Sequence, residues 1–220
     1  MRLTINNKRL HISKGNDKIG KNGVTYVWSL PAFKTCTNST TMCRYFCYAK
    51  ASELLYKEVL PCRERNYVES LKDSFVDDMI NLIACKLKYA KVKMEYFRIH
   101  EGGDFYSLAY FDKWMQIVRA FPQVKFLAFT KSTFVKNRIH ELPSNLNLFY
   151  SVWADTQASD IIHELPLSIA GDCEHLVPAK DSFECTGKCA ECYHCFNKRT
   201  NVHFKIHGIK ATNNAKKGNK

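Results

Sequence analysis

The chain has 220 residues, of which 45% are hydrophobic and 13% aromatic, which is enough for one sizeable domain with its own core. No apolar run approaches the length of a membrane span, and the first 20 residues lack the apolar segment of a signal peptide, so we expect a cytoplasmic protein without membrane contact. A net charge of +12 excludes a strongly acidic protein and makes a nucleotide or nucleic acid an alternative partner.

Strand and helix patterns alternate along most of the chain. Runs of β-branched and aromatic residues predict strands, and apolar residues that recur with a 3.6 period predict helices. Because this alternation favours parallel strands joined by right-handed crossovers, we predict an α/β fold, a partial, open βα barrel, with a doubly wound sheet as the alternative. The predicted strands cover residues 24–31, 94–100, 125–131, 147–155 and 166–172, and the predicted helices cover residues 42–57, 64–89 and 107–121.

The predicted domain organisation has four parts. Residues 1–23 form a polar lead-in, and residues 24–172 form the partial barrel. Residues 173–209 are rich in cysteine and form an irregular cap over the mouth of the barrel. Residues 210–220 lack apolar periodicity and carry several lysines, which predicts a disordered, basic tail.

Three cysteines follow the first predicted strand, at Cys36, Cys43 and Cys47. If residues 42–57 form one helix, Cys43 and Cys47 lie four residues apart on the same face of it. Three thiols so close together in a cytoplasmic protein need a metal, an iron–sulfur cluster or a reactive-thiol role. With ten cysteines and no sign of secretion, ligation is favoured over disulfides.

A second cysteine set lies near the other end of the chain, with gaps of three, two and two residues. Thiolates at such spacings converge on one centre, and four of them select soft metals such as zinc or iron in a cluster. Cys62 and Cys85 are expected to be small core hydrophobes instead. The second set consists of Cys185, Cys189, Cys192 and Cys195.

Polar residues also gather where the predicted strands end. In a barrel of parallel strands, ligands bind at the carboxyl ends of the strands, and paired glycines let the backbone approach a ligand closely. These ends carry Arg98, His100, Gly102, Gly103, Asp104, Lys131 and Asp155.

Four spaced motifs resemble the phage "gene product 88" proteins over about residues 28–196: the C-x6-C-x3-CYA run at residues 36–49, FRIHEGGDF at 97–105, FLAFTK at 126–131 and CAECYHC at 189–195. These proteins in turn resemble distant relatives of the radical S-adenosylmethionine superfamily. There, a three-cysteine loop after the first strand holds a [4Fe-4S] cluster with one open iron, and a Gly-Gly-Glu stretch binds the amino group of S-adenosylmethionine.

The resemblance implies roles for individual residues. Cys36, Cys43 and Cys47 would hold the cluster, although their spacing differs from the usual C-x3-C-x2-C of that superfamily. A fourth ligand would come from elsewhere if the iron is not open, and Cys173 is the best candidate. The second set would hold a further cluster, with zinc as the alternative there, or both sets would share one larger cluster. Arg98, His100 and Asp104 would be catalytic, and Gly102, Gly103, Asp104, Lys131 and Asp155 would bind the cofactor.

Three functional hypotheses follow. The first is an iron–sulfur redox enzyme of the radical S-adenosylmethionine type, acting in the host cytoplasm with an electron donor as its partner. The second is an electron carrier or redox sensor without an organic cofactor. The third is a nucleic-acid-binding protein whose fold is stabilised by bound zinc, which the +12 charge and the closely spaced terminal cysteines favour.

Overall fold

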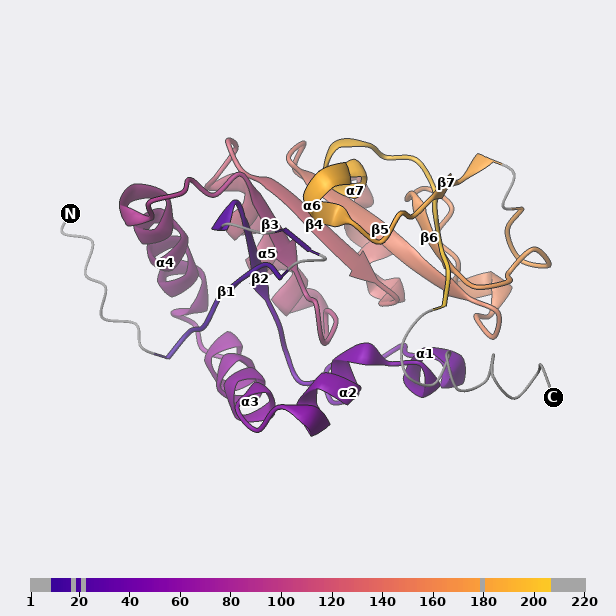
Figure 1. The fold of residues 1–220 in the computed structure, drawn as a ribbon, viewed down its shortest axis with the longest axis horizontal. Helices are drawn as coiled ribbons and strands as arrows, with labels where there is room; N and C mark the ends of the chain where they lie inside the picture. The colour runs from indigo at the N-terminus through magenta and orange to yellow at the C-terminus, as the bar shows by residue number, and fades with distance from the viewer. Residues whose placement is uncertain (1–8, 17–18, 21–22, 179–180, 207–220) are drawn as a thin grey trace.

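The computed structural model describes residues 9–16, 19–20, 23–178 and 181–206, and its centre is one eight-stranded sheet (Figure 1). The strand order is β1-β2-β3-β4-β5-β6-β8-β7. Every neighbouring pair is parallel except β1 and β2, which are antiparallel. The strands are β1 (Ser13–Lys14), β2 (Thr25–Trp28), β3 (Tyr96–Ile99), β4 (Lys125–Thr130), β5 (Leu146–Trp153), β6 (Leu167–Ala170), β7 (Phe183–Glu184) and β8 (Val202–Phe204).

The sheet is open, with β1 at one edge and β7 at the other. The prediction of an α/β fold with mostly parallel strands is therefore confirmed, and the described sheet does not close into a barrel. The helices are α1 (Thr41–Tyr45), α2 (Tyr48–Leu55), α3 (Val59–Ser70), α4 (Phe75–Tyr89), α5 (Leu108–Arg119), α6 (Cys189–Cys192) and α7 (His194–Asn197), and 3-10 turns cover Thr133–Glu141 and Ala158–Asp160.

The two faces of the sheet have different partners. Side chains alternate along a strand, so Phe97 and Ile99 join the main core with α4 and α5, whereas Tyr96 and Arg98 face the opposite side. That opposite face is covered by α6 and α7, which lie in front of β4 in Figure 1 while α5 lies behind the sheet. A smaller apolar cluster forms there around Phe196.

The cysteine-rich segment differs from the predicted irregular cap, because it adds β7 and β8 to the sheet. Between these two strands the chain folds back over the sheet and packs α7 against β4 and β5. The Asn147 amide of β5 holds it there by donating to the carbonyls of Cys195 (2.9 Å) and Lys198 (3.2 Å).

Two predicted helices are each divided in the structure. The helix over 42–57 becomes α1 and α2, because Cys47 is extended and caps α2 with its sulfur, which accepts from the Lys50 amide at 3.3 Å. Cys43 and Cys47 therefore do not share one helix, and that prediction was wrong. The helix over 64–89 becomes α3 and α4, which a short polar turn separates after Leu71.

No helix in the described part of the chain is long and apolar enough to cross a membrane. The predicted basic tail at 210–220 and the first eight residues of the predicted lead-in lie outside the described residues.

Candidate metal and cofactor site

A cavity of about 260 Å³ opens at the carboxyl ends of the parallel strands and extends over the face covered by α6 and α7. Seven of the ten cysteines line it, three from the loop and helices after β2 and four from the segment between β7 and β8. The polar residues predicted at the strand ends also contribute, except Asp155. The lining cysteines are Cys36, Cys43, Cys47, Cys185, Cys189, Cys192 and Cys195.

The loop after β2 holds the first cysteine set through a tight turn. The Thr35 hydroxyl donates to the Pro31 carbonyl at 2.8 Å, and the Cys36 amide donates to the carbonyl of Phe33, whose φ is +69°. Burial, together with Asp104 and the two other thiols of the set, raises the pKa of the Cys36 thiol to about 12. The metal-free thiol is therefore protonated at neutral pH, and a bound metal would have to displace that proton.

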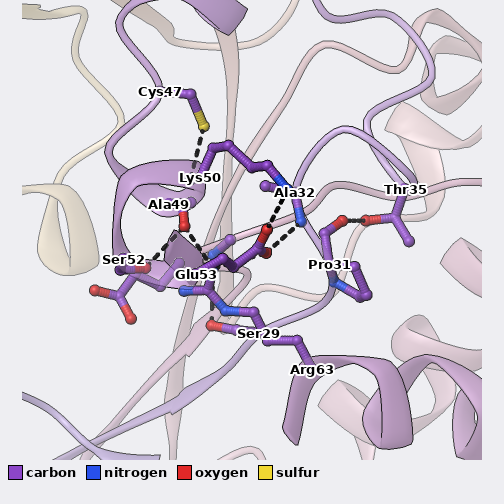
Figure 2. Close-up of polar contacts among 12 residues, drawn as sticks. Ser29, Pro31, Ala32, Thr35, Cys47, Ala49, Lys50, Ser52, Glu53 and Arg63 are labelled. Atoms are coloured by element: carbon purple, nitrogen blue, oxygen red, sulfur yellow. Dashed lines mark hydrogen bonds and ion pairs between the residues drawn. The ribbon is translucent and has the colours of Figure 1, made fainter. Parts of the chain in front are cut away.

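A buried ion pair fixes this loop to the helices beneath it (Figure 2). The Glu53 carboxylate accepts from the Ala32 amide at 2.7 Å and from the Arg63 guanidinium at 3.1 Å, and Arg63 also donates to the Ala49 carbonyl at 2.9 Å. Glu53 and Arg63 are each 6% exposed. Neither residue stands out in the sequence, because α2 and α3 carry several charged residues and nothing in their pattern marks these two as buried.

The Gly102–Gly103 pair is used for close packing. A Cβ at Gly102 would lie 2.7 Å from the Cζ of Arg63, and one at Gly103, where φ is +83°, would lie 2.6 Å from the Thr35 hydroxyl. The two glycines thus seat the loop after β3 on the loop after β2, which explains them without a ligand.

Asp104 ties the ends of β3 and β4 together. Its Oδ1 accepts from the Phe105 amide and the Thr130 hydroxyl, both at 2.7 Å, and its Oδ2 accepts from the Lys131 amide at 2.8 Å. Burial raises its pKa, although these three hydrogen bonds oppose that shift. Since a carboxylate has about four acceptor positions, one on Oδ2 remains for a ligand in the cavity.

Arg98 and His100 are neighbours on β3 and its end, but their side chains have different surroundings. Arg98 lines the cavity, stacks over the Phe129 ring at 5.3 Å and donates to the Tyr48 hydroxyl at 3.1 Å. His100 has a φ of +66°, and its ring packs against Phe105 and Trp114 in the helix-side core.

Burial, together with the charge of Arg98, lowers the pKa of His100 to about 3, so the imidazole is neutral at neutral pH. Its Nε2 lies 3.0 Å from the Tyr110 hydroxyl. These contacts hold the ring against the core, while His100 also lines the cavity and its buried Nδ1 has no hydrogen-bond partner.

Three further predicted residues have different places. Lys131 lines the cavity with its ammonium 6.0 Å from the centre of the Trp153 ring. Asp155 lies outside the cavity lining and accepts from the Met42 amide at 2.8 Å, so it anchors the helix that carries Cys43. Cys173 is 1% exposed within the main core, and the structure does not bring it to either cysteine set.

The second cysteine set is built on the segment over the sheet. Cys185 follows β7 and its amide donates to the His203 carbonyl of β8 at 2.8 Å, while Cys189 and Cys192 delimit α6 and Cys195 lies in α7. Burial, together with the other three thiols of the set, raises the pKa of Cys195 to about 12, although Arg98 opposes the shift. These electrostatic interactions show that the four thiols of the set lie close to one another.

The two sets do not form a preassembled single-ion site. Among the described residues, no group of three or more His, Cys, Asp or Glu side chains converges tightly enough to hold one metal ion. A zinc ion bound to sulfur at about 2.3 Å requires its sulfurs within about 3.8 Å of one another. An iron–sulfur cluster binds each thiolate through a different iron, so it fits thiols that are near each other but further apart.

Comparison with known proteins gives one family. The family model described as "Gene product 88" matches residues 4–180. The Gene 88 protein of Mycobacterium phage D29 is 30% identical over 158 residues, which is 66% of this chain and 63% of that protein. The Gene 88 protein of Mycobacterium phage L5 is 27% identical over 227 residues, or 89% of this chain and 92% of that protein.

No solved structure matches the chain. The matches support the gene product 88 resemblance and leave the resemblance to the radical S-adenosylmethionine superfamily without support.

Proposed function

We propose that the chain, which belongs to the gene product 88 family, is an iron–sulfur redox enzyme, because the seven cysteines that line its cavity form two sets. One cluster would be held by Cys36, Cys43 and Cys47, and the second by the four cysteines between β7 and β8. The observation that carries the proposal is that both sets, from distant parts of the sequence, line one cavity. Packing alone gives no reason for that arrangement.

The arrangement of the thiols supports two separate clusters. Electrostatic interactions link Cys36 to Cys43 and Cys47, and they link Cys195 to the other members of its own set. The first set has three cysteines, and Cys173 does not reach it, so the cluster there would keep one iron for another ligand. The second set has four and would be closed.

The cavity supports an enzyme over a simple electron carrier, because it leaves space beside both sets. We infer that S-adenosylmethionine is the organic cofactor and that the open sheet corresponds to part of the βα barrel of its superfamily. The cluster and the sulfonium would supply one-electron cleavage chemistry when bound. The remaining acceptor position on Asp104 Oδ2 would orient the amino group, and the aromatic rings of Trp153 and Phe129 would exclude water.

The reaction would take place in a reducing cytoplasm and would require an external one-electron donor. Zinc is the alternative metal at the four-cysteine set, where four thiolates could hold one ion. The partially exposed thiols of both sets leave the clusters accessible to such a donor.

The test is a metal analysis of the anaerobically purified protein. We expect about eight irons and eight sulfides per chain, as two cubane clusters require, and an electron paramagnetic resonance signal of the reduced protein that shifts when S-adenosylmethionine is added. Cys189→Ala together with Cys192→Ala should remove about half of the iron. Cys62→Ala is the matched control, because Cys62 is partly exposed but lies outside the cavity.

The other outcomes are equally informative. Iron without a shift on adding S-adenosylmethionine would indicate an electron carrier, a redox sensor or a cluster enzyme with a different cofactor. Zinc without iron would refute the proposal and would favour the hypothesis of a nucleic-acid-binding protein instead.

A further inference from the structure

Arg98 lies on the cavity side of β3, between the two cysteine sets. Its Nη2 donates to the hydroxyl of Tyr48, the residue after Cys47, and that hydroxyl donates in turn to the Glu101 carbonyl at 2.8 Å. The guanidinium also interacts electrostatically with Cys189 and Cys195 of the second set. The Tyr48 bond and the stacking on a phenylalanine ring hold its position from two sides.

The Glu101 carboxylate acts electrostatically on this guanidinium, but it does not form a salt bridge with it. In the described part of the chain Arg98 forms no ion pair, whereas the buried Arg63 is paired with Glu53. The Nε of Arg98 is shielded from solvent and has no hydrogen-bond partner. Since this guanidinium forms no salt bridge and keeps one donor unpaired, it can still bind an anion in the cavity.

We propose that Arg98 is the counter-ion of the iron–sulfur cluster on Cys185, Cys189, Cys192 and Cys195, and that it raises the reduction potential of this cluster. The inference rests on the proposed function. Reduction adds one electron from an external one-electron donor to the cluster and breaks no bond, so the reduced cluster carries one more negative charge. A fixed positive charge nearby stabilises that state more than the oxidised one.

The consequence is a change in how readily the second cluster takes up an electron. With Arg98 beside it, the second cluster holds an electron more readily than it would in a neutral cavity. The bond to Tyr48, the residue after Cys47, also keeps the guanidinium beside the first set. The second cluster would thus accept an electron from the external donor more readily and would give it up less readily.

The test is a redox titration of the full-length, iron-loaded protein followed by electron paramagnetic resonance. Arg98→Gln and Arg98→Met remove the charge, and methionine keeps an apolar contact with Phe129 if glutamine does not fold. We expect at least a tenfold fall in the ratio of reduced to oxidised second cluster at a given potential, which is 59 mV for one electron. Arg98→Lys keeps the charge and should recover most of this ratio.

Lys131→Gln is the matched control, because it removes one positive charge from the same cavity. Unlike Arg98, Lys131 is not among the charges that shift the pKa of Cys189 or of Cys195. Iron content is measured for every variant. A shift with Arg98→Gln no larger than with Lys131→Gln, at unchanged iron, would overturn the role of Arg98. Wild-type protein without iron would overturn the proposed function, and the inference with it.

Discussion

Replacing Glu53 by glutamine keeps the shape of a side chain that is 6% exposed but removes its charge. The change leaves the Arg63 guanidinium, also 6% exposed, without its carboxylate. It also weakens the acceptor of the Ala32 amide, which lies in the loop leading to Cys36. The perturbation therefore acts on stability and on the first cysteine set together.

The expected cost follows from the burial of the pair. Removing one partner of a buried ion pair costs about 3–5 kcal/mol, because the other charge stays buried and uncompensated. For a chain of this size, each kcal/mol lowers Tm by about 2–4 °C, so Tm should fall by roughly 6–20 °C. Glu64→Gln breaks the surface pair of Glu64 with Lys34, whose side chains are 39% and 46% exposed, and should cost only about 0–1 kcal/mol.

The assay is thermal and urea unfolding of both variants, together with their iron content. Adding Arg63→Met to Glu53→Gln should recover part of the lost free energy of unfolding, since it removes the uncompensated charge. In iron-loaded protein, Glu53→Gln should lower the iron of the first set and leave that of the second. A free energy of unfolding within about 1 kcal/mol of the wild type, or equal to that of Glu64→Gln, would refute this reasoning.

Three further predictions concern the same region. Gly103→Ala should destabilise the protein by about 1–3 kcal/mol because of its positive φ, and the new Cβ, 2.6 Å from the Thr35 hydroxyl, adds a further cost. The control in a comparison of urea midpoints is Gly187→Ala, because Gly187 also has a positive φ but a Cβ there would have no atom within 4 Å. Asp155→Ala should cost about 0.5–2 kcal/mol, as the loss of a helix cap does, and should lower first-set iron by freeing the Met42 amide; unchanged iron would contradict the anchoring role. The free energy of unfolding of the metal-free chain should fall as pH rises from about 9 toward 12, because the unfolded chain releases the proton of Cys36 at a lower pH than the folded chain does. In urea unfolding, the free energy of unfolding should fall more steeply with pH for the wild type than for Cys36→Ala.

The alternation of strand and helix patterns was sufficient for most of the sheet. The predicted strand over 94–100 is β3, and the weak run over 166–172 is β6 in the same parallel sheet, because apolar runs bounded by Pro or Gly mark buried parallel strands. β7 and β8 were not predicted. They have two and three residues, and partners distant in the sequence rather than a periodic pattern of their own stabilise them.

The candidate site was predictable in its thiols and less so in the residues that support them. The cysteine spacing singled out both sets, whereas the spacing of Gly102 and Gly103 did not identify their neighbours. Two glycines at a strand end indicate a close approach, and the sequence does not say what approaches. Here the close neighbours are Arg63 and Thr35, both from the same chain.

The position of the second set depends on the path of the chain between β7 and β8. From β2 to β7 the sheet takes six steps between neighbouring strands, and at about 4.8 Å a step a flat sheet would place their ends about 29 Å apart. Twist alone does not close that gap in an open sheet. The segment closes it by folding back and packing α7 on β4 and β5, where Asn147 holds it. Asn147 is polar although only 7% exposed, because its amide holds the segment that brings the second cysteine set to the same cavity as the first.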